Sequence, residues 1–187
     1  TMRVTKEPEV RKQEILDTAL KLFGENGYEK TSITDIAKAI GVAQGLCYRY
    51  FPSKEALFDG AIEQYADVLV EQLVGFEKDD HKSLRQIIED MPATMEDRDA
   101  KYYSVFHQAE NKKFHDQLSL KVCEKLVPPV EKLLQRAQQN GEIKIDDLQA
   151  AAMFCVYGQL GILLADELTQ EDKSKRIREF LIYALRL

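Results

Sequence analysis

Residues Thr31–Lys54, TSITDIAKAIGVAQGLCYRYFPSK, contain the clearest structural pattern in the chain. Ser32 with Asp35 three residues later predicts a helix N-terminus, because the hydroxyl accepts from free helix N–H groups and the carboxylate faces the positive helix end. Apolar residues follow at helical spacing, and Gly41 predicts a left-handed turn at the end of this helix. A second helix over about residues 43–51 stops at the following proline, which cannot donate the next helical hydrogen bond. Two short helices joined by a glycine-led turn make a helix-turn-helix.

The second predicted helix has an apolar side and a polar side. At about 100° per residue, Cys47 and Phe51 fall on the inner side, and four residues fall on the outer side. These outer residues are Gln44, Gly45, Tyr48 and Arg49. Arginine commonly reads guanine, glutamine pairs with adenine and tyrosine bonds phosphate, so this face suits DNA. Lys54 begins the next helix, where its ammonium and free N–H groups can share a phosphate. The alternative is a helical hairpin with a solvated polar face.

Residues 10–69 contain the segment ILDTALKLFGENGYEKTSITDIAKAIGVAQGLCYRYFPSKEALF. Its distinctive positions are Ala19, Phe23, Gly27, Tyr28, residues 31–37, Gly41, Val42, Gly45, Tyr48, Tyr50, Phe51 and residues 54–57. With these residues the segment resembles the DNA-binding head of the tetracycline-repressor (TetR) family of bacterial regulators. The resemblance covers about the first third of the chain, and the remainder is similar to the family only in length and helical character. Two positions depart from the family pattern: Cys47 replaces a usual leucine, and Leu46 replaces a frequent small polar residue.

The resemblance implies a homodimeric transcriptional repressor that binds a near-palindromic operator in double-stranded DNA. It also implies that a small-molecule effector, filling the helical body, releases the protein from the operator. In this interpretation Gln44, Arg49 and Thr34 contact bases, and Tyr48, Tyr50 and Lys54 contact phosphates. The full predicted set of DNA-binding residues is Thr31, Ser32, Thr34, Gln44, Gly45, Leu46, Tyr48, Arg49, Tyr50 and Lys54.

The composition is that of an ordinary globular protein, with 44% hydrophobic and 31% charged residues and a formal net charge of −6. Residues 1–54, the predicted DNA-binding domain, carry nine basic and seven acidic residues, so their charge is +2. Residues 55–187, the predicted ligand-binding and dimerisation domain, carry seventeen basic and twenty-five acidic residues, or −8. Because the head is only weakly basic, DNA affinity should depend on dimerisation and on placed contacts more than on bulk charge.

The sequence offers no recognisable catalytic or metal-binding motif. Its three cysteines lack CxxC spacing, its three histidines lack an HExxH pattern, and it has no P-loop, dinucleotide-binding glycine motif or serine elbow. We therefore expect no enzymatic activity, no cofactor and no metal. With no signal peptide at the start of the sequence, a reducing cytoplasm is the expected compartment. The alternatives are an enzyme built on a helix-turn-helix scaffold and a helical protein-interaction module, which leaves the outward polar face unexplained.

The periodicity predicts an all-α fold of about nine helices, with a three-helix head and a larger helical body. The expected helices are residues 9–25, the two motif helices, Ser53 to about 76, 83–91, 99–111, 113–127, a segment after Pro128–Pro129 up to 139, Asp146 to 165, and 172–187. The two prolines should either kink the helix that precedes them or make a helix restart after them, because residues before proline avoid helical geometry.

The run from Ala150 to Ala165 has a single polar side chain, Gln159. It is short of the ~20 residues of a membrane span and acids flank it, so we expect no membrane partner. A helix apolar all round is buried by its own core on one side and by a partner on the other. By resemblance, this helix and the last one form a four-helix dimer interface. The predicted interface residues are Phe154, Tyr157, Gly158, Gly161, Ile177, Phe180, Leu181 and Ala184.

The middle of the chain is rich in methionine and aromatic residues, as an apolar ligand cavity requires. Core packing explains these residues equally well. The predicted cavity residues are Tyr65, Leu69, Met95, Tyr103, Phe106 and Phe114, with His107 or Gln159 as a polar anchor.

Overall fold

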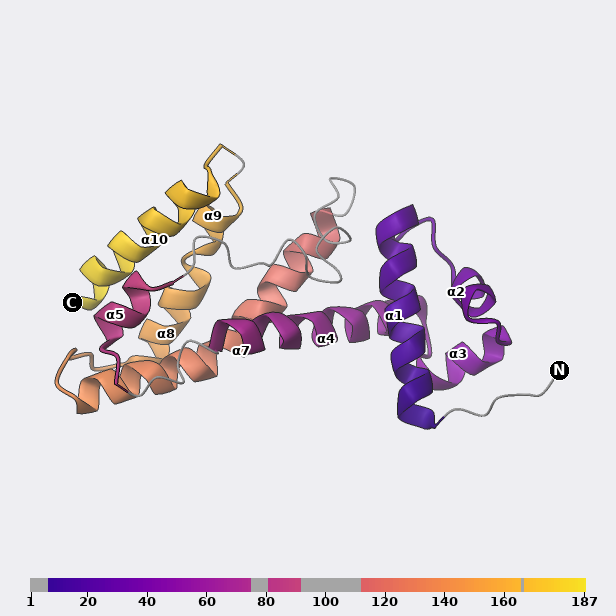
Figure 1. Ribbon diagram of the computed structural model, residues 1–187, viewed down its shortest axis with the longest axis horizontal. Helices are drawn as coiled ribbons and strands as arrows, with labels where there is room; N and C mark the ends of the chain where they lie inside the picture. The colour runs from indigo at the N-terminus through magenta and orange to yellow at the C-terminus, as the bar shows by residue number, and fades with distance from the viewer. Residues whose placement is uncertain (1–6, 75–80, 92–111, 166) are drawn as a thin grey trace. The chain divides into compact units, whose positions relative to one another are not determined.

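The computed structural model describes residues 7–74, 81–91, 112–165 and 167–187 of the 187-residue chain. The part of the chain that it describes forms nine helices and no strand, which confirms the predicted all-α class (Figure 1). The helices are α1 (Pro8–Asn26), α2 (Ile33–Ile40), α3 (Gln44–Tyr50), α4 (Lys54–Val74), α5 (Leu84–Glu89), α7 (Lys112–Gln139), α8 (Leu148–Tyr157), α9 (Leu160–Leu163) and α10 (Gln170–Leu185). The helix predicted over residues 99–111 lies outside the described residues.

The described residues divide into two compact units. The head unit contains residues 7–65 and 112–118, and the body unit contains the described residues of 66–97 and 119–187. The chain passes from head to body within α4. The head unit extends further along α4 than the predicted domain boundary at residue 54, because Leu57, Phe58 and Ala61 on this helix are buried apolar residues of the head.

The head core is built from apolar faces of four helices. Its buried members include Ile15, Leu16, Ala19, Leu20 and Phe23 of α1, Ile33, Ile36 and Ala37 of α2, Cys47 of α3, and Leu57, Phe58, Ala61, Ile62 and Tyr65 of α4. Three rings form a cluster within it: the Phe23 and Tyr28 centroids lie 5.3 Å apart, and those of Tyr28 and Phe58 lie 4.6 Å apart. Each fully buried large apolar side chain stabilises the fold by about 1.5–3 kcal/mol, so this core makes the head a rigid support for α3.

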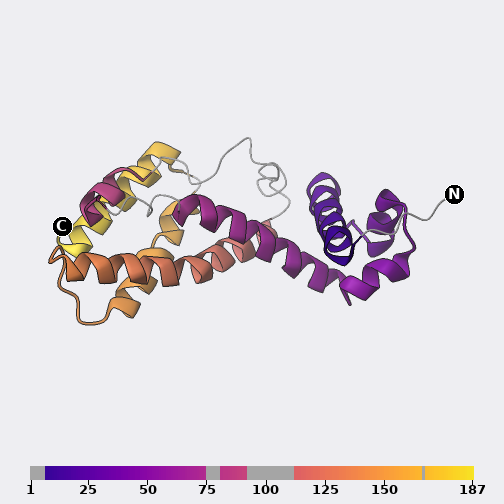
Figure 2. The same ribbon diagram turned by 60° about the horizontal axis from the view of Figure 1, so that its bottom comes forward.

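The body core joins α5, α7, α8 and α10. Its buried cluster comprises Leu84, Ile88, Leu134, Ala137, Ile143, Ala152, Ile177, Leu181 and Leu185. Figures 1 and 2 show α5 beside α10, in keeping with the apolar residues that these two helices share in the cluster. The chain therefore brings a short helix near its middle against its last helix.

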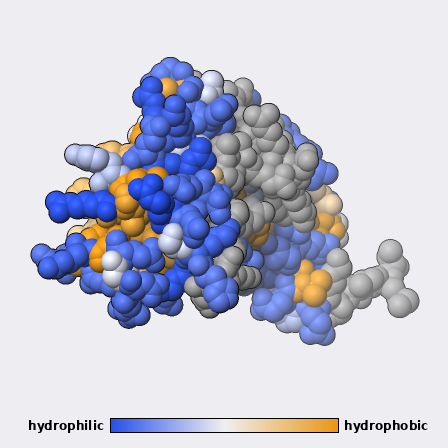
Figure 3. Space-filling model, turned by 60° about the vertical axis from the view of Figure 1, so that its left-hand side comes forward, coloured by the Kyte–Doolittle hydropathy of each residue, from blue (hydrophilic) through white to orange (hydrophobic). Residues whose placement is uncertain are grey.

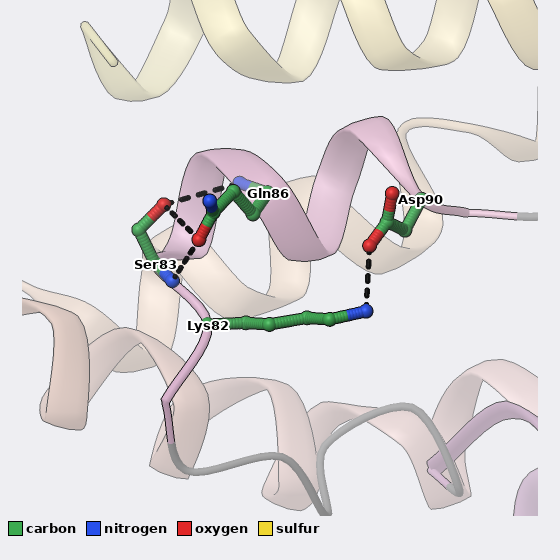
Figure 4. A network of polar contacts seen from close by, with 4 residues as sticks. All are labelled: Lys82, Ser83, Gln86 and Asp90. Atoms are coloured by element: carbon green, nitrogen blue, oxygen red, sulfur yellow. Dashed lines mark hydrogen bonds and ion pairs between the residues drawn. The ribbon is translucent and has the colours of Figure 1, made fainter.

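Polar contacts fix both ends of α5. Ser83 and Gln86 form a capping box, in which the Ser83 N–H donates to Gln86 Oε1 at 3.0 Å (Figure 4). The Leu84 N–H donates to Glu142 Oε2 at 2.6 Å, and Arg178 donates to the Met91 carbonyl at 2.9 Å. Because two of these bonds come from distant parts of the chain, a helix of six residues is held firmly in place.

Of the two outcomes predicted at Pro128–Pro129, a restarted helix is wrong, because α7 continues through both prolines to Gln139. Each proline lacks the N–H that a helix interior uses, at a cost of about 3 kcal/mol. Packing on both sides offsets this cost, since Cys123 precedes the prolines and Leu134 and Ala137 follow them as buried residues.

The long apolar helix predicted over residues 150–165 is divided in two. α8 ends at Tyr157 and α9 begins at Leu160, with Gly158 between them. A Cβ on this glycine would lie 2.5 Å from the Phe154 carbonyl oxygen, so the turn requires glycine. The N-cap of α8 is Asp147, which accepts from the Ala150 N–H at 2.8 Å, so the helix begins after the predicted start at Asp146. Among the described residues, no helix carries an apolar stretch long enough to span a bilayer.

Candidate nucleic-acid interface

The first helix of the motif, α2, begins with the predicted cap. The Asp35 N–H donates to Ser32 Oγ at 3.2 Å, and the Ser32 N–H donates to Asp35 Oδ2 at 3.0 Å. The Ser32 hydroxyl also donates to Asp35 Oδ2, at 2.6 Å, and this bond holds the pKa of the Asp35 carboxyl below its usual value. The Ser32 hydroxyl proton is therefore engaged within the chain, although the residue is exposed.

The turn between α2 and α3 depends on Gly41. This residue has φ 76° and ψ 36°, in the left-handed region that favours glycine. Val42 follows it and donates its N–H to the Ala37 carbonyl at 2.9 Å, which closes the end of α2. The turn sets the direction in which α3 leaves the head.

The second helix of the motif, α3, has the predicted inner and outer sides. Cys47 is fully buried, and burial raises the pKa of its thiol, which therefore stays protonated. Tyr50 is half-buried on the inner side. The predicted outer residues Gln44, Gly45, Tyr48 and Arg49 are all exposed. Two other predicted DNA-binding residues, Thr34 of α2 and Leu46 of α3, are half-buried.

Gly45 has open space around it. A Cβ built on this residue would meet no atom within 4 Å, and its backbone is not in the left-handed region. Neither packing nor conformation inside the chain therefore requires glycine here. A glycine on an exposed helix face instead permits close approach of a partner's backbone or phosphates.

Lys54 occupies the predicted position at the start of α4. Ser53 precedes it and accepts the Ala56 N–H at 3.1 Å, as a helix cap does. Lys54 Nζ lies 4.1 Å from the centroid of the Tyr28 ring and donates to the Glu29 carbonyl at 3.4 Å. Sequence reasoning missed this contact, because it used Tyr28 as a position that carries the family resemblance and not as a partner of Lys54. Pairs so distant in sequence leave no local pattern.

Thr31, predicted to bind DNA, is a core residue instead. Its relative exposure is 2%, and its Oγ1 lies 3.1 Å from the Leu22 carbonyl oxygen and 2.9 Å from that of Gly27. The single hydroxyl proton is shared between two backbone carbonyls, so the side chain has neither the exposure nor the free donor that a DNA contact needs.

The head matches a family model. Residues 15–61 fit the model of "Bacterial regulatory proteins, tetR family", and this segment contains α2, α3 and most of the head core. The head therefore has the sequence pattern of the TetR-family DNA-binding region.

Curated relatives match about a third of the chain or less. The uncharacterized HTH-type transcriptional regulator YuxN of Bacillus subtilis (strain 168) is 49% identical over 53 residues, which are 28% of this chain and 18% of YuxN. The HTH-type transcriptional repressor KstR2 of Rhodococcus jostii (strain RHA1) is 41% identical over 59 residues, 32% of this chain and 29% of KstR2. The chain thus spans less than a third of the length of these curated relatives.

Solved structures resemble the chain over nearly its full length. Salmonella enterica GusR superposes with a TM-score of 0.66 and covers 97% of this chain and 98% of its own, at 22% identity. At this identity the similarity concerns the fold alone, which is the all-helical fold described above.

The predicted cavity residues are only partly described. Tyr65 is buried in the head unit and Leu69 is buried in the body unit. Gln159, the predicted polar anchor, donates its side-chain N–H to the Cys155 carbonyl. Met95, Tyr103, Phe106 and His107 lie outside the described residues, as does the side chain of Phe114.

The predicted dimer residues divide into an exposed set and a core set. Phe154 and Phe180 are 81% and 62% exposed, Tyr157 is half-buried, and Gly158, Gly161 and Ala184 are exposed. Ile177 and Leu181 are only 3% and 6% exposed and belong to the body core, so we remove them from the predicted interface. They occupy the inward side of α10, one turn apart, which the apolar pattern alone did not separate from its outward side.

Sequence reasoning also missed Tyr183, which is 80% exposed three residues after Phe180. We use the name exposed apolar face for Phe154, Tyr157, Phe180, Tyr183 and Ala184. Figure 3 shows hydrophobic residues gathered at the surface of the body among hydrophilic ones. Exposed large apolar groups of this kind are typical of protein interaction sites.

Proposed function

We propose that the protein is a homodimeric transcriptional repressor whose α3 enters the major groove of operator DNA. The observation that carries this proposal is the outward row of α3, where Gln44, Tyr48 and Arg49 are exposed on a helix whose opposite side is anchored by buried Cys47. Side chains that read bases must project from a rigid element, and the head core supplies that rigidity.

The outer residues divide into two chemical roles. Gln44 and Arg49 carry the planar donor and acceptor groups that recognise adenine and guanine in the major groove. Tyr48 and Lys54 present a hydroxyl and an ammonium, which suit phosphate oxygens and carry no base preference. Thr34 and Leu46, both half-buried, remain secondary candidates for contacts at the edge of the groove.

The experiment is selection of a duplex from a random-sequence library by the wild-type protein, followed by titration of the selected duplex. Gln44→Ala should lose roughly 1–3 kcal/mol of binding free energy and relax the preference at one base position. Lys54→Ala should weaken the selected duplex and a random duplex alike, and lower the salt slope by about 0.9 per head. If the wild-type protein enriches no sequence, a protein-interaction module becomes the better interpretation.

We propose dimerisation through the exposed apolar face. Phe154, Phe180 and Tyr183 present large apolar groups to solvent from α8 and α10. A two-fold dimer buries the same patch of each copy and places two recognition helices on one duplex. Two α3 helices then contact half-sites about 34–36 Å apart, one helical turn of DNA.

We further propose that a small molecule bound in the body releases the operator. The support is the family resemblance and the course of α4, which begins in the head and continues into the body. A hundredfold loss of operator affinity requires about 2.7 kcal/mol of coupling, and the operator must weaken the ligand by the same factor. Gel shifts of the selected duplex with fractionated metabolite extracts identify the ligand, and calorimetry with and without duplex then tests the reciprocity.

A further inference from the structure

Lys54 stands at a position where helix stability disfavours a cation. It is the first residue of α4, and the N-terminal end of a helix carries a partial positive charge that favours acidic residues. Glu55, the next residue, follows that preference. The presence of an ammonium beside this end is therefore better explained by what it binds than by the stability of α4.

The ammonium is held in one place by two groups of the loop that follows α1. Nζ lies over the Tyr28 ring, 4.1 Å from its centroid, and donates one N–H to the Glu29 carbonyl at 3.4 Å. A cation over an aromatic face is attracted by the negative face of the ring. Because a lysine ammonium has three donors, this arrangement leaves N–H groups for an anion.

The Tyr28 ring is itself fixed. It packs between Phe23 and Phe58, with centroid separations of 5.3 Å and 4.6 Å. Burial, together with the carboxylates of Glu55, Glu29 and Asp59, raises the pKa of Tyr28, so the ring is a neutral phenol at physiological pH. The head core therefore orients the ring, and the ring orients the lysine.

We infer that Tyr28 is a positioning residue for the DNA backbone: its ring and the Glu29 carbonyl hold the Lys54 ammonium ready for a phosphate. The inference rests on the proposed function. A free lysine loses rotamer freedom when it contacts a ligand, and fixing the stem beforehand reduces that loss. The expected benefit is roughly two- to tenfold in affinity for each head, at any base sequence.

The test is a double-mutant cycle on Tyr28 and Lys54. The probe is a duplex of about 30 base pairs, three helical turns, selected by the wild-type protein, together with a random duplex of equal length. Tyr28→Leu should weaken both duplexes by about two- to tenfold per head, and Tyr28→Phe, which keeps the ring, should restore most of the loss. In the Lys54→Met background, Tyr28→Leu should have no further effect, because the residue it positions is gone.

If Tyr28→Leu weakened DNA binding only by disturbing the head core, the double-mutant cycle would give a different result. Tyr28→Leu would then weaken binding equally with and without Lys54, and that additive result overturns the inference. Lys144→Met, which removes one exposed lysine of the body, controls for the change in net charge. A wild-type protein that binds neither duplex would instead refute the proposed function and leave the Lys54–Tyr28 contact to be judged by spectroscopy.

Spectroscopy tests the contact without any substitution. Protons on the Lys54 stem that lie over the Tyr28 ring should show an upfield ring-current shift in the free protein, lost in Tyr28→Leu and kept in Tyr28→Phe. Ordinary lysine shifts in the wild-type protein overturn the inference, even if Tyr28→Leu fails to fold.

Discussion

Thr31 and Thr34 stand three residues apart, yet the head places them in opposite environments. Thr31 is buried and bonded to the backbone after α1, whereas Thr34 lies half-buried on α2. Both had been predicted to bind DNA. The sequence alone did not distinguish them, because a threonine hydroxyl suits a phosphate and a buried carbonyl equally well.

Thr31→Val should lower the free energy of unfolding by about 1 kcal/mol, because it leaves the carbonyls of Leu22 and Gly27 without their shared donor. Thr31→Ser keeps the hydroxyl and should retain most of that stability. Urea unfolding measures both variants, and duplex titration should give the wild-type salt slope for each. A reduced slope in Thr31→Val at unchanged stability would return Thr31 to the DNA interface.

Asp35 should make the head sensitive to acid. The hydrogen bond from the Ser32 hydroxyl lowers its pKa in the folded protein below the unfolded value. A group lowered in this way stabilises the fold above the unfolded pKa, and the contribution disappears as the pH falls through the folded pKa. Asp35→Asn should therefore lower the melting temperature at neutral pH and approach the wild-type value in acid.

Ser32→Ala is the matched variant for this test. It keeps the Asp35 carboxylate and removes the hydroxyl that lowers its pKa, so it should show a similarly weakened dependence on pH. Melting temperatures of both variants and of the wild-type protein, measured across the acid range, check the prediction. Parallel pH curves for all three proteins contradict it.

At the scale of helices, the sequence predicted the helix ends that are fixed by hydrogen bonds between neighbouring residues. The cap at Ser32 was predicted because its capping box lies within four consecutive residues. The course of α7 through Pro128–Pro129 was not predicted, because the packing that holds both halves of α7 comes from residues distant in sequence. The turn at Gly158 was missed for a related reason, since an apolar run gives no sign of where it bends.

Pro128→Ala should raise the free energy of unfolding by about 1–2 kcal/mol. The alanine restores a helical donor worth about 3 kcal/mol, offset in part by the greater freedom of the unfolded chain. Pro128 is exposed, so little packing is lost. Pro8→Ala is the control, because Pro8 occupies the first position of α1, where a helix tolerates proline. An equal response of the two variants in urea unfolding would show that α7 gains nothing from the restored donor.

At the scale of the whole molecule, the proposed dimer gives opposite roles to two neighbouring residues of α10. Phe180 faces solvent and Leu181 faces the body core. The helical period separates adjacent residues by about 100°, so one side chain can serve a partner while the next serves the fold. The sequence identified the apolar residues of α10 correctly, and the fold of the body was needed to divide them between these two roles.

Phe180→Glu should produce monomers that keep the fold of each copy, because the substitution places a charge in the proposed interface and removes no core contact. These monomers should lose most of their affinity for a selected duplex with two half-sites, since only one α3 is then available to it.

Leu181→Ala should do the reverse: it should lower the free energy of unfolding by about 2–5 kcal/mol through a core cavity and leave the exposed apolar face intact. Sedimentation velocity at micromolar concentration, circular dichroism and urea unfolding separate the two outcomes. A wild-type protein that sediments as a monomer, or a Phe180→Glu dimer, would place the interface elsewhere and leave the exposure of Phe154, Phe180 and Tyr183 to be explained by another partner.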